Sequence, residues 1–183
     1  PGQTYYFENS LDFLDAEGEW VLNETSGMLY YIPRAGKDVS TAEVIAPALE
    51  LLVDIVGGHH IQFEGIVFEH SHWDIPDDAR TSLQAGYHIN NHFMPSGVRL
   101  ANTHHIRFDG NTFQHMGGGA IELAYGTHNT VIHDNTITDI SGNGITIYTD
   151  HENANPSEDH MSLNDVISQN RINRVGQEYT GCV

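Results

Sequence analysis

Hydrophobic and polar residues alternate in short segments along most of this chain, and the segments recur. One copy of the recurring unit is HIQFEGIVF, residues 60–68, and another is HIRFDGNTF, residues 105–113. Two further copies are NTVIHDNTI, residues 129–137, and NDVISQNRI, residues 164–172. Alternation with a period of two, rich in β-branched and aromatic residues, predicts strands. The repeats therefore predict a solenoid in which each copy is part of one coil.

The spacing of the copies separates the bare coil from its insertions. The equivalent positions Phe63, Phe108, Ile132 and Ile167 lie 45, 24 and 35 residues apart. The shortest spacing is that of a bare coil, so the longer ones contain insertions of 21 and 11 residues. Helical repeats would need long stretches with apolar residues at i, i+3, i+4 and i+7, and the chain has none. We therefore predict an all-β fold, a right-handed parallel β-helix.

Polar residues recur at two turns of the predicted coil. Asn111, Asn135 and Asn170 stand between the second and third segments. Asparagine tolerates the left-handed backbone of a tight turn, so these residues are expected to stack at one corner. At another corner the histidines 59–60, 104–105 and 128 recur. This recurrence is typical of a stacked ladder, and we predict no metal site from it.

The first strand of each coil predicts where a binding groove lies. Side chains alternate across a strand, so Val53, Ile55, Val98, Leu100, Ile121, Leu123, Ile145 and Ile147 should point inward. The residues between them, Asp54, Arg99, Glu122 and Thr146, should form an outward row with neighbours about 4.8 Å apart. The insertions near residues 71–96 and 149–160 flank this sheet. Long loops on a rigid scaffold often form binding sites, so we place the groove over this row.

The N-terminal part of the chain follows a different pattern. Residues 19–22 and 28–32 are alternating segments around a turn that Gly27 closes, which predicts a β-hairpin. We divide the chain into a hairpin module, residues 1–40, and β-helix coils, residues 41–183. Both ends of the sequence read as interior segments, because a solenoid needs capped ends. We therefore expect an internal fragment of a longer protein, whose remaining coils are its neighbours.

Charge and composition exclude some partners. The formal net charge is −18, with one lysine and six arginines among 183 residues. No basic stripe is available to meet phosphates, so nucleic acid is not an expected partner. The sequence has no apolar run long enough to span a membrane and no signal peptide, and we expect no membrane partner. The single cysteine, Cys182, cannot form an internal disulfide.

Several segments resemble a known group of proteins. These are residues 9–20 with 27–33, residues 65–73 with 84–86, and residues 174–179. Together they resemble large carbohydrate-active β-helix proteins of the pectin-lyase-like superfamily, and within it glycoside hydrolases that act on fucosyl, xylosyl or pectic linkages. The resemblance implies a secreted or periplasmic enzyme whose substrate is a polysaccharide or oligosaccharide. It does not identify a catalytic pair.

Glycoside hydrolysis usually needs two carboxyl groups, and the outward row offers the first. Glu122 lies in its centre beside Arg99, which should hold the carboxylate ionised and so suit it to act as a base or nucleophile. The alternative is a structural ion-pair ladder of Asp54, Arg99 and Glu122. The second candidate is Asp150, where the second insertion begins, and its alternative is a turn residue. Asp139 is a reserve, and His115 is its equivalent one coil earlier.

Other residues around the groove are candidates for binding sugar. His72, Trp73 and Gln84 belong to the first insertion, and Tyr125 and Tyr148 lie at the far edge of the sheet. A tryptophan face suits the C–H face of a sugar ring, but Trp73 could equally anchor its loop on the solenoid. These five residues join Arg99 and His115 as predicted substrate contacts.

Two other functions fit the same fold. A polysaccharide lyase would need a basic group, for which Arg99 is the only cation in the row, and Ca²⁺ bound by carboxylates. The hydrolase hypothesis needs no cofactor. A non-catalytic β-helix, such as an adhesin or tailspike, would bind glycan through the same groove without cleaving it.

Overall fold

The structure is a computed structural model that describes residues 10–74, 94–147 and 157–179. The chain divides into two compact units, Pro1–Ile45 and Ala46–Val183. Within the described ranges, no helix has the length and apolar character needed to cross a membrane. Each unit is described by itself below.

The N-terminal unit contains the predicted hairpin. Strands β1, Trp20–Asn23, and β2, Met28–Tyr31, pair antiparallel with Trp20 opposite Tyr31. Gly27 closes the turn with a φ of 67°, in the left-handed region that glycine adopts without steric cost. Two short 3-10 helices flank the hairpin, η1 at Leu11–Phe13 and η2 at Val39–Thr41.

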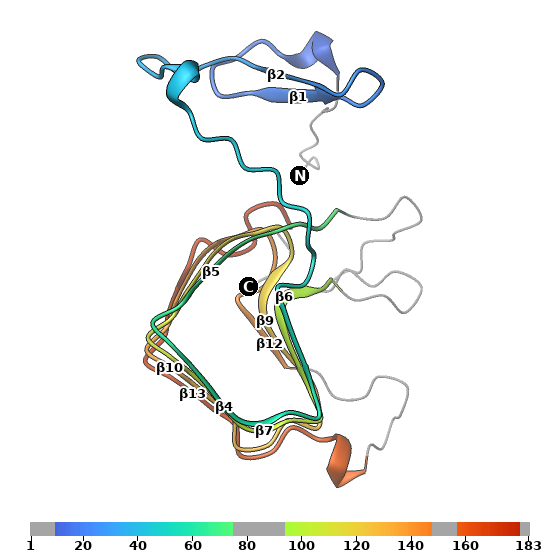
Figure 1. Ribbon diagram of the computed structural model, residues 1–183, viewed down its shortest axis with the longest axis vertical. Coiled ribbons are helices and arrows are strands. Elements are labelled where there is room, and N and C mark those ends of the chain that lie inside the picture. The colour runs from blue at the N-terminus through green and yellow to red at the C-terminus, as the bar shows by residue number, and fades with distance from the viewer. Residues whose placement is uncertain (1–9, 75–93, 148–156, 180–183) are drawn as a thin grey trace, which may run out of the picture. The chain divides into compact units, whose positions relative to one another are not determined.

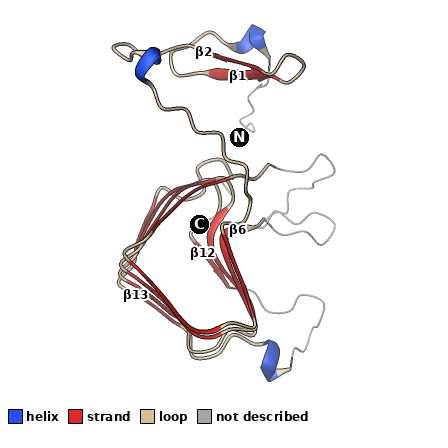
Figure 2. Cartoon of the chain, viewed as in Figure 1, coloured by secondary structure: helices blue, strands red, loops and turns tan. Residues whose placement is uncertain are grey.

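The second unit is a stack of coils with three faces, and each face is a parallel sheet (Figure 1). The first sheet has the order β12-β9-β6-β3, with strands Ile145–Ile147, Gly119–Tyr125, Ser96–Ala101 and Val53–Val56. The second has the order β13-β10-β7-β4, with strands Val166–Ser168, Val131–His133, His104–Asp109 and His59–Glu64. The third has the order β14-β11-β8-β5, with strands Arg171–Asn173, Thr136–Ile140, Thr112–Met116 and Val67–Ser71. A third 3-10 helix, η3, spans Glu158–His160 (Figure 2).

The register of the sheets confirms the alignment of the repeats. Phe63 pairs with Phe108, Phe108 with Ile132, and Ile132 with Ile167. Strands that succeed one another in the sequence therefore belong to different sheets, and each strand pairs with its equivalent in the next coil. This is the topology of a parallel β-helix, as the alternation predicted.

Equivalent apolar side chains stack on one another to fill the coil interior. The rings of Phe63 and Phe108 stack at 4.8 Å, and those of Phe68 and Phe113 at 4.9 Å. The predicted inward residues of β6 and β9 are fully buried. Ile147 was also predicted to point inward, yet 51% of it is exposed. The reason is its place on β12, an edge strand that only β9 pairs with in the described part of the chain.

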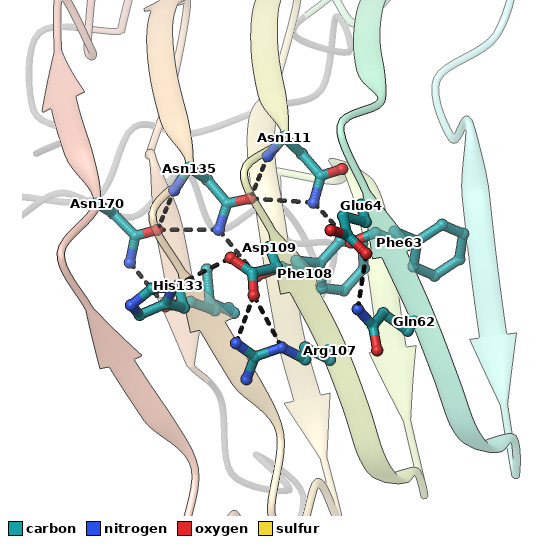
Figure 3. Close-up of polar contacts among 11 residues, drawn as sticks. Gln62, Phe63, Glu64, Arg107, Phe108, Asp109, Asn111, His133, Asn135 and Asn170 are labelled. Atoms are coloured by element: carbon teal, nitrogen blue, oxygen red, sulfur yellow. Dashed lines mark hydrogen bonds and ion pairs between the residues drawn. The ribbon is translucent and has the colours of Figure 1, made fainter.

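The asparagine corner is a buried hydrogen-bond ladder (Figure 3). The side-chain oxygen of Asn135 accepts from the Asn111 backbone N–H at 2.9 Å, and its amide nitrogen donates to the Phe108 carbonyl at 3.1 Å. Asn170 repeats this pattern on Asn135. The predicted reason was wrong, because the left-handed backbone belongs to the preceding residues, Gly110, Asp134 and Gln169. Asparagine is used here for its side-chain amide.

The histidine corner is also a stacked ladder, as predicted. The rings of His59 and His104 stack at 4.7 Å with an interplanar angle of 9°, and those of His60 and His105 at 4.7 Å with an angle of 4°. His128 continues the column of His104 in the next coil. Desolvation, then the like charges of the neighbouring histidines, lower the pKa of His104.

Candidate active site

The outward row of the first sheet forms as predicted. Asp54 pairs with Arg99 in the strand register, Arg99 with Glu122, and Glu122 with Thr146. The Arg99 guanidinium lies between two carboxyl groups. Its Nη1 is 3.4 Å from Asp54 Oδ1, and its Nε is 3.8 Å from Glu122 Oε1. The predicted ion-pair ladder is therefore present, and it places two carboxyl groups on either side of one cation.

Glu122 differs from the rest of this row in its burial. Its side chain is 10% exposed, whereas that of Arg99 is 32% exposed and that of Asp54 is 42% exposed. Desolvation raises the pKa of Glu122, and the nearby Asp54 charge raises it further. The attraction of Arg99 and a hydrogen bond with the backbone of Ser96 act in the opposite direction but are weaker.

This balance bears on the role expected for Glu122, which stays a prediction. We predicted that Arg99 would hold the carboxylate ionised, as a base or nucleophile requires. Most of the side chain is removed from water, and this desolvation outweighs the attraction of Arg99, so the pKa of Glu122 is raised. A carboxyl group with a raised pKa keeps its proton to higher pH, which suits a general acid.

Both insertions join the sheet that contains this row. The first insertion lies between β5 and β6, and the second follows β12. Because the strands are parallel, the first enters at the beginning of the strands and the second leaves at their end. At the entry corner, Gly117 leaves no space for a Cβ, which would lie 2.6 Å from the Trp73 backbone nitrogen, and Gly118 leaves none beside the Pro95 carbonyl oxygen at 2.3 Å. These glycines allow the two ends of the first insertion to pack closely on the coil.

Asp139 lies in a column at this same corner. It is equivalent to His70, His115 and Arg174 in the other coils, and all four have positive φ, between 50° and 64°. Asp139 Oδ2 is 2.8 Å from Nδ1 of His115, and its Oδ1 accepts a hydrogen bond from Arg174 at 3.0 Å. The structure thus brings Asp139 and His115 together, as the repeat alignment predicted. Both Asp139 oxygens have basic partners, which fits an anchoring ion pair.

The two described candidates on the first insertion have different environments. Trp73 is 7% exposed and packs edge-on against Tyr179, with ring centroids 4.9 Å apart. Met94 completes this small apolar cluster. Of the two alternatives for Trp73, its packing favours the loop anchor. His72 is 45% exposed, and its Nε2 lies 3.3 Å from Asp74 Oδ2.

Of the remaining candidates, Tyr125 falls within the described residues and lies at the far edge of the sheet. Tyr125 ends β9, and its ring centroid is 5.8 Å from that of His160 on η3, the short helix at the end of the second insertion. Asp150, Gln84 and Tyr148 lie outside the described residues. Their predicted roles stay predictions.

Two features of the site were missed in the sequence. From the sequence, Asp54 was assigned only to the ion-pair ladder. The repeat alignment nevertheless placed it two coils from Glu122, with Arg99 in the coil between them. The second is a network on the neighbouring face, where Asp109 accepts from Arg107 Nε at 3.0 Å and lies 3.0 Å from His133 Nδ1 (Figure 3). Hydrogen bonds from His133 and Arg107 lower the pKa of Asp109. The signal for the first was the alignment of acidic and basic residues in successive copies. The signal for the second was Arg107 two positions before Asp109, with His133 aligned to Asp109 in the next copy.

The comparisons with known proteins agree with this architecture. The model of the right handed beta helix region matches residues 54–160, which is more than half of the chain. The chain belongs to the right handed beta helix family. A solved structure of a protein named glycoside hydrolase is similar over 95% of this chain, with a TM-score of 0.79 and 26% sequence identity. This β-helix chain covers 36% of that protein's length. Comparison with curated proteins found no match.

Proposed function

We propose that the protein is a glycoside hydrolase in which Glu122 acts as general acid in a groove over the outward row. The observation that carries this proposal is the burial of one carboxyl group, Glu122, in a row that is otherwise open to solvent. A polysaccharide or oligosaccharide is the proposed substrate. A secreted or periplasmic location is proposed with it, since polymeric substrates are met there.

The chemistry requires a proton donor at the leaving oxygen. A general acid protonates the glycosidic oxygen as the bond breaks, and its pKa must be high enough that the proton is present before the reaction. Desolvation raises the pKa of Glu122, which is the direction that this role requires. Arg99 lies 3.8 Å away, where its charge stabilises the carboxylate that forms once the proton has been transferred.

A second carboxylate must activate water or attack the anomeric carbon. Asp150 is the predicted partner, and Asp54 is the partner that the described residues offer. Asp54 and Glu122 lie two rungs apart, so their backbones are separated by about 9.6 Å. The carboxyl groups themselves lie on either side of the Arg99 guanidinium, 3.4 and 3.8 Å from its nitrogens, so their separation is nearer the roughly 6.5–9.5 Å of inverting enzymes than the roughly 5–5.5 Å of retaining enzymes. We therefore propose that water attacks directly.

The similarity to a protein named glycoside hydrolase supports the class of reaction. The sugar and the linkage remain to be found by screening the full-length protein against polysaccharides and aryl glycosides. The decisive variant is Glu122→Gln, which keeps the size of the side chain and removes the acid. Glu64→Gln is the matched control, because Glu64 is an exposed carboxylate on a different sheet.

The expected result depends on the leaving group. Loss of a general acid costs about 10²–10⁴ in rate, and the loss should be greatest for polysaccharide, whose sugar leaving group needs a proton. An aryl glycoside with an acidic phenol needs little protonation, so Glu122→Gln should retain most activity on it. Wild-type activity of Glu122→Gln on polysaccharide would refute the assignment. Calcium-dependent release of unsaturated uronate would identify a lyase, and glycan binding without shortening would identify a binding protein.

A further inference from the structure

The histidine corner contains a feature that stacking alone does not require. Within each coil the two imidazoles are nearly perpendicular, at 89° for His59 and His60 and 86° for His104 and His105. Their Nδ1 atoms face one another at 3.0 Å in both pairs. Each contact is a hydrogen bond from one ring N–H to the other ring's nitrogen, so each pair holds two potential ligand atoms close together, and a bound metal would replace the shared proton.

The partners of these rings set them apart from other histidines of the chain. His72, His115 and His133 each lie within 3.3 Å of an aspartate oxygen. In the described residues, no such carboxylate partner is found for the rings at positions 59, 60, 104 and 105, which contact one another instead. The nitrogens of these rings are therefore not held by an acidic side chain, and imidazole nitrogen is a common metal ligand.

The backbone does not demand histidine at this corner. His60 and His105 have φ values of 55° and 56°, and the equivalent positions in the next two coils are Asn129 and Asn164, with φ of 54° and 58°. Asparagine adopts the left-handed conformation more readily than most residues. The chain thus has a suitable residue for this turn and uses it in two coils, but places an imidazole there in the other two.

We propose that His60, His104 and His105 bind a divalent transition metal of the zinc type. One nitrogen from each of the three rings lies within 4.8 Å of the others. Two imidazole nitrogens on one tetrahedral zinc lie about 3.4 Å apart, given Zn–N bonds of about 2.0–2.1 Å. The 3.0 Å separation in the His104–His105 pair is close to this, and rotation of the exposed His60 ring brings in the third ligand.

The surroundings leave room for the rest of the coordination sphere. A surface hollow beside His104 is lined by Asn102, Thr103, Gly126, His128 and Asp159. Water in this hollow, or the His59 ring, can supply a fourth ligand. The net charge of −18 favours accumulation of cations near the surface. Because His60 belongs to β4 and the other two ligands to β7, the metal would clamp two successive coils.

The site is distinct from the proposed groove and changes the sequence-based expectation of no metal. The ladder itself was predicted correctly. The alignment of copies showed that the rings stack between coils, but it did not show that the two rings within a coil turn their Nδ1 atoms toward each other.

The test is calorimetric titration of the metal-free full-length protein with ZnCl₂, with MgCl₂ and CaCl₂ as controls, followed by thermal unfolding. The variant is the triple substitution His60→Asn, His104→Leu and His105→Asn. Each new residue already occupies the same position in a later coil, at Asn129, Leu163 and Asn164. The matched control is His133→Asn with His115→Asn, which removes two histidines elsewhere.

The proposal expects saturable binding of one Zn²⁺ per chain with a dissociation constant in the micromolar range or below, and a raised unfolding temperature. Both should be lost in the triple variant and kept in the control. Cobalt(II) should show the absorption bands of tetrahedral coordination in the wild type only. Absence of saturable zinc binding would refute the proposal, and so would equal binding by the triple variant, since the zinc would then be held by other residues.

Discussion

The asparagine corner and the histidine corner are both ladders of one polar residue type, but they satisfy their polar atoms in opposite ways. Asn111 and Asn135 are 1% exposed, and their side chains bond to backbone groups of the neighbouring coil. The histidines bond and stack with one another at the surface. Removal of a buried asparagine leaves backbone groups unpaired, whereas water can replace an exposed imidazole. We infer that the first ladder maintains the fold and that the second is free to bind a ligand.

The largest expected effect is at the asparagine corner, with Asn135→Leu. This substitution keeps the number and branching of the side-chain heavy atoms and removes the amide. The Asn111 N–H and the Phe108 carbonyl then lose their partners in a buried environment. Each buried unpaired group costs about 1–3 kcal/mol, so the free energy of unfolding should fall by about 2–6 kcal/mol. Urea denaturation measures it, and a loss below about 1 kcal/mol would show that the ladder is not what holds this corner.

The coil register could be predicted from the sequence because apolar side chains recur at equivalent positions. Phe63, Phe108 and Ile132 occupy the same position of the repeat, and a parallel sheet requires only that each residue pair with its equivalent. Side-chain partners within a coil follow from no such rule. Neighbouring segments determine by their packing which residue of the turn takes the left-handed backbone, here Asp134 with a φ of 53°, and how deeply Glu122 is buried. The repeat predicted these positions but not these properties.

The candidate site shows the same limit. The outward row and the pairing of Arg99 with Asp54 and Glu122 were predictable, because alternation and the repeat define them. The environment of Trp73 was not predictable, because its partner Tyr179 lies more than 100 residues away in the sequence. No periodic pattern connects a residue of an insertion with a residue several coils later.

The second expected effect concerns Glu122. Like Asn135 it is a buried polar residue, but its neighbours include the charged side chains of Arg99 and Asp54. Its pKa is raised in the folded state, so the folded protein prefers the protonated form. The contribution of protonated Glu122 to the free energy of unfolding is therefore present at low pH and is lost as the pH rises through the folded-state pKa. Glu122→Gln should therefore gain stability relative to the wild type from acidic to neutral pH. Urea denaturation at several pH values checks this, and an advantage that shrinks as the pH rises would contradict the direction of the shift.

A smaller effect is expected at the histidine corner with His104→Leu in metal-free protein. Leucine already occupies the equivalent position at residue 163, so the strand register accepts it. The lost contacts are those of partly exposed rings, and the free energy of unfolding should change by less than about 1 kcal/mol. With zinc present the difference from the wild type should grow, because only the wild type keeps all three proposed ligands. A large loss without metal would place this corner in the same class as the asparagine corner.

The smallest effect is expected for His105→Asn, and its value lies in comparison with His105→Val. Both substitutions remove the imidazole from a position with a φ of 56°. Asparagine tolerates this backbone, as Asn129 does one coil later, so the free energy of unfolding should change by no more than about 0.5 kcal/mol. Valine is β-branched and should lose about 1–2 kcal/mol through backbone strain. The difference between the variants isolates the backbone, because the lost ring is common to both. Equal losses in urea denaturation would mean that the ring, and not the turn, stabilises the corner, and the histidines would then have a structural role like that of Asn135.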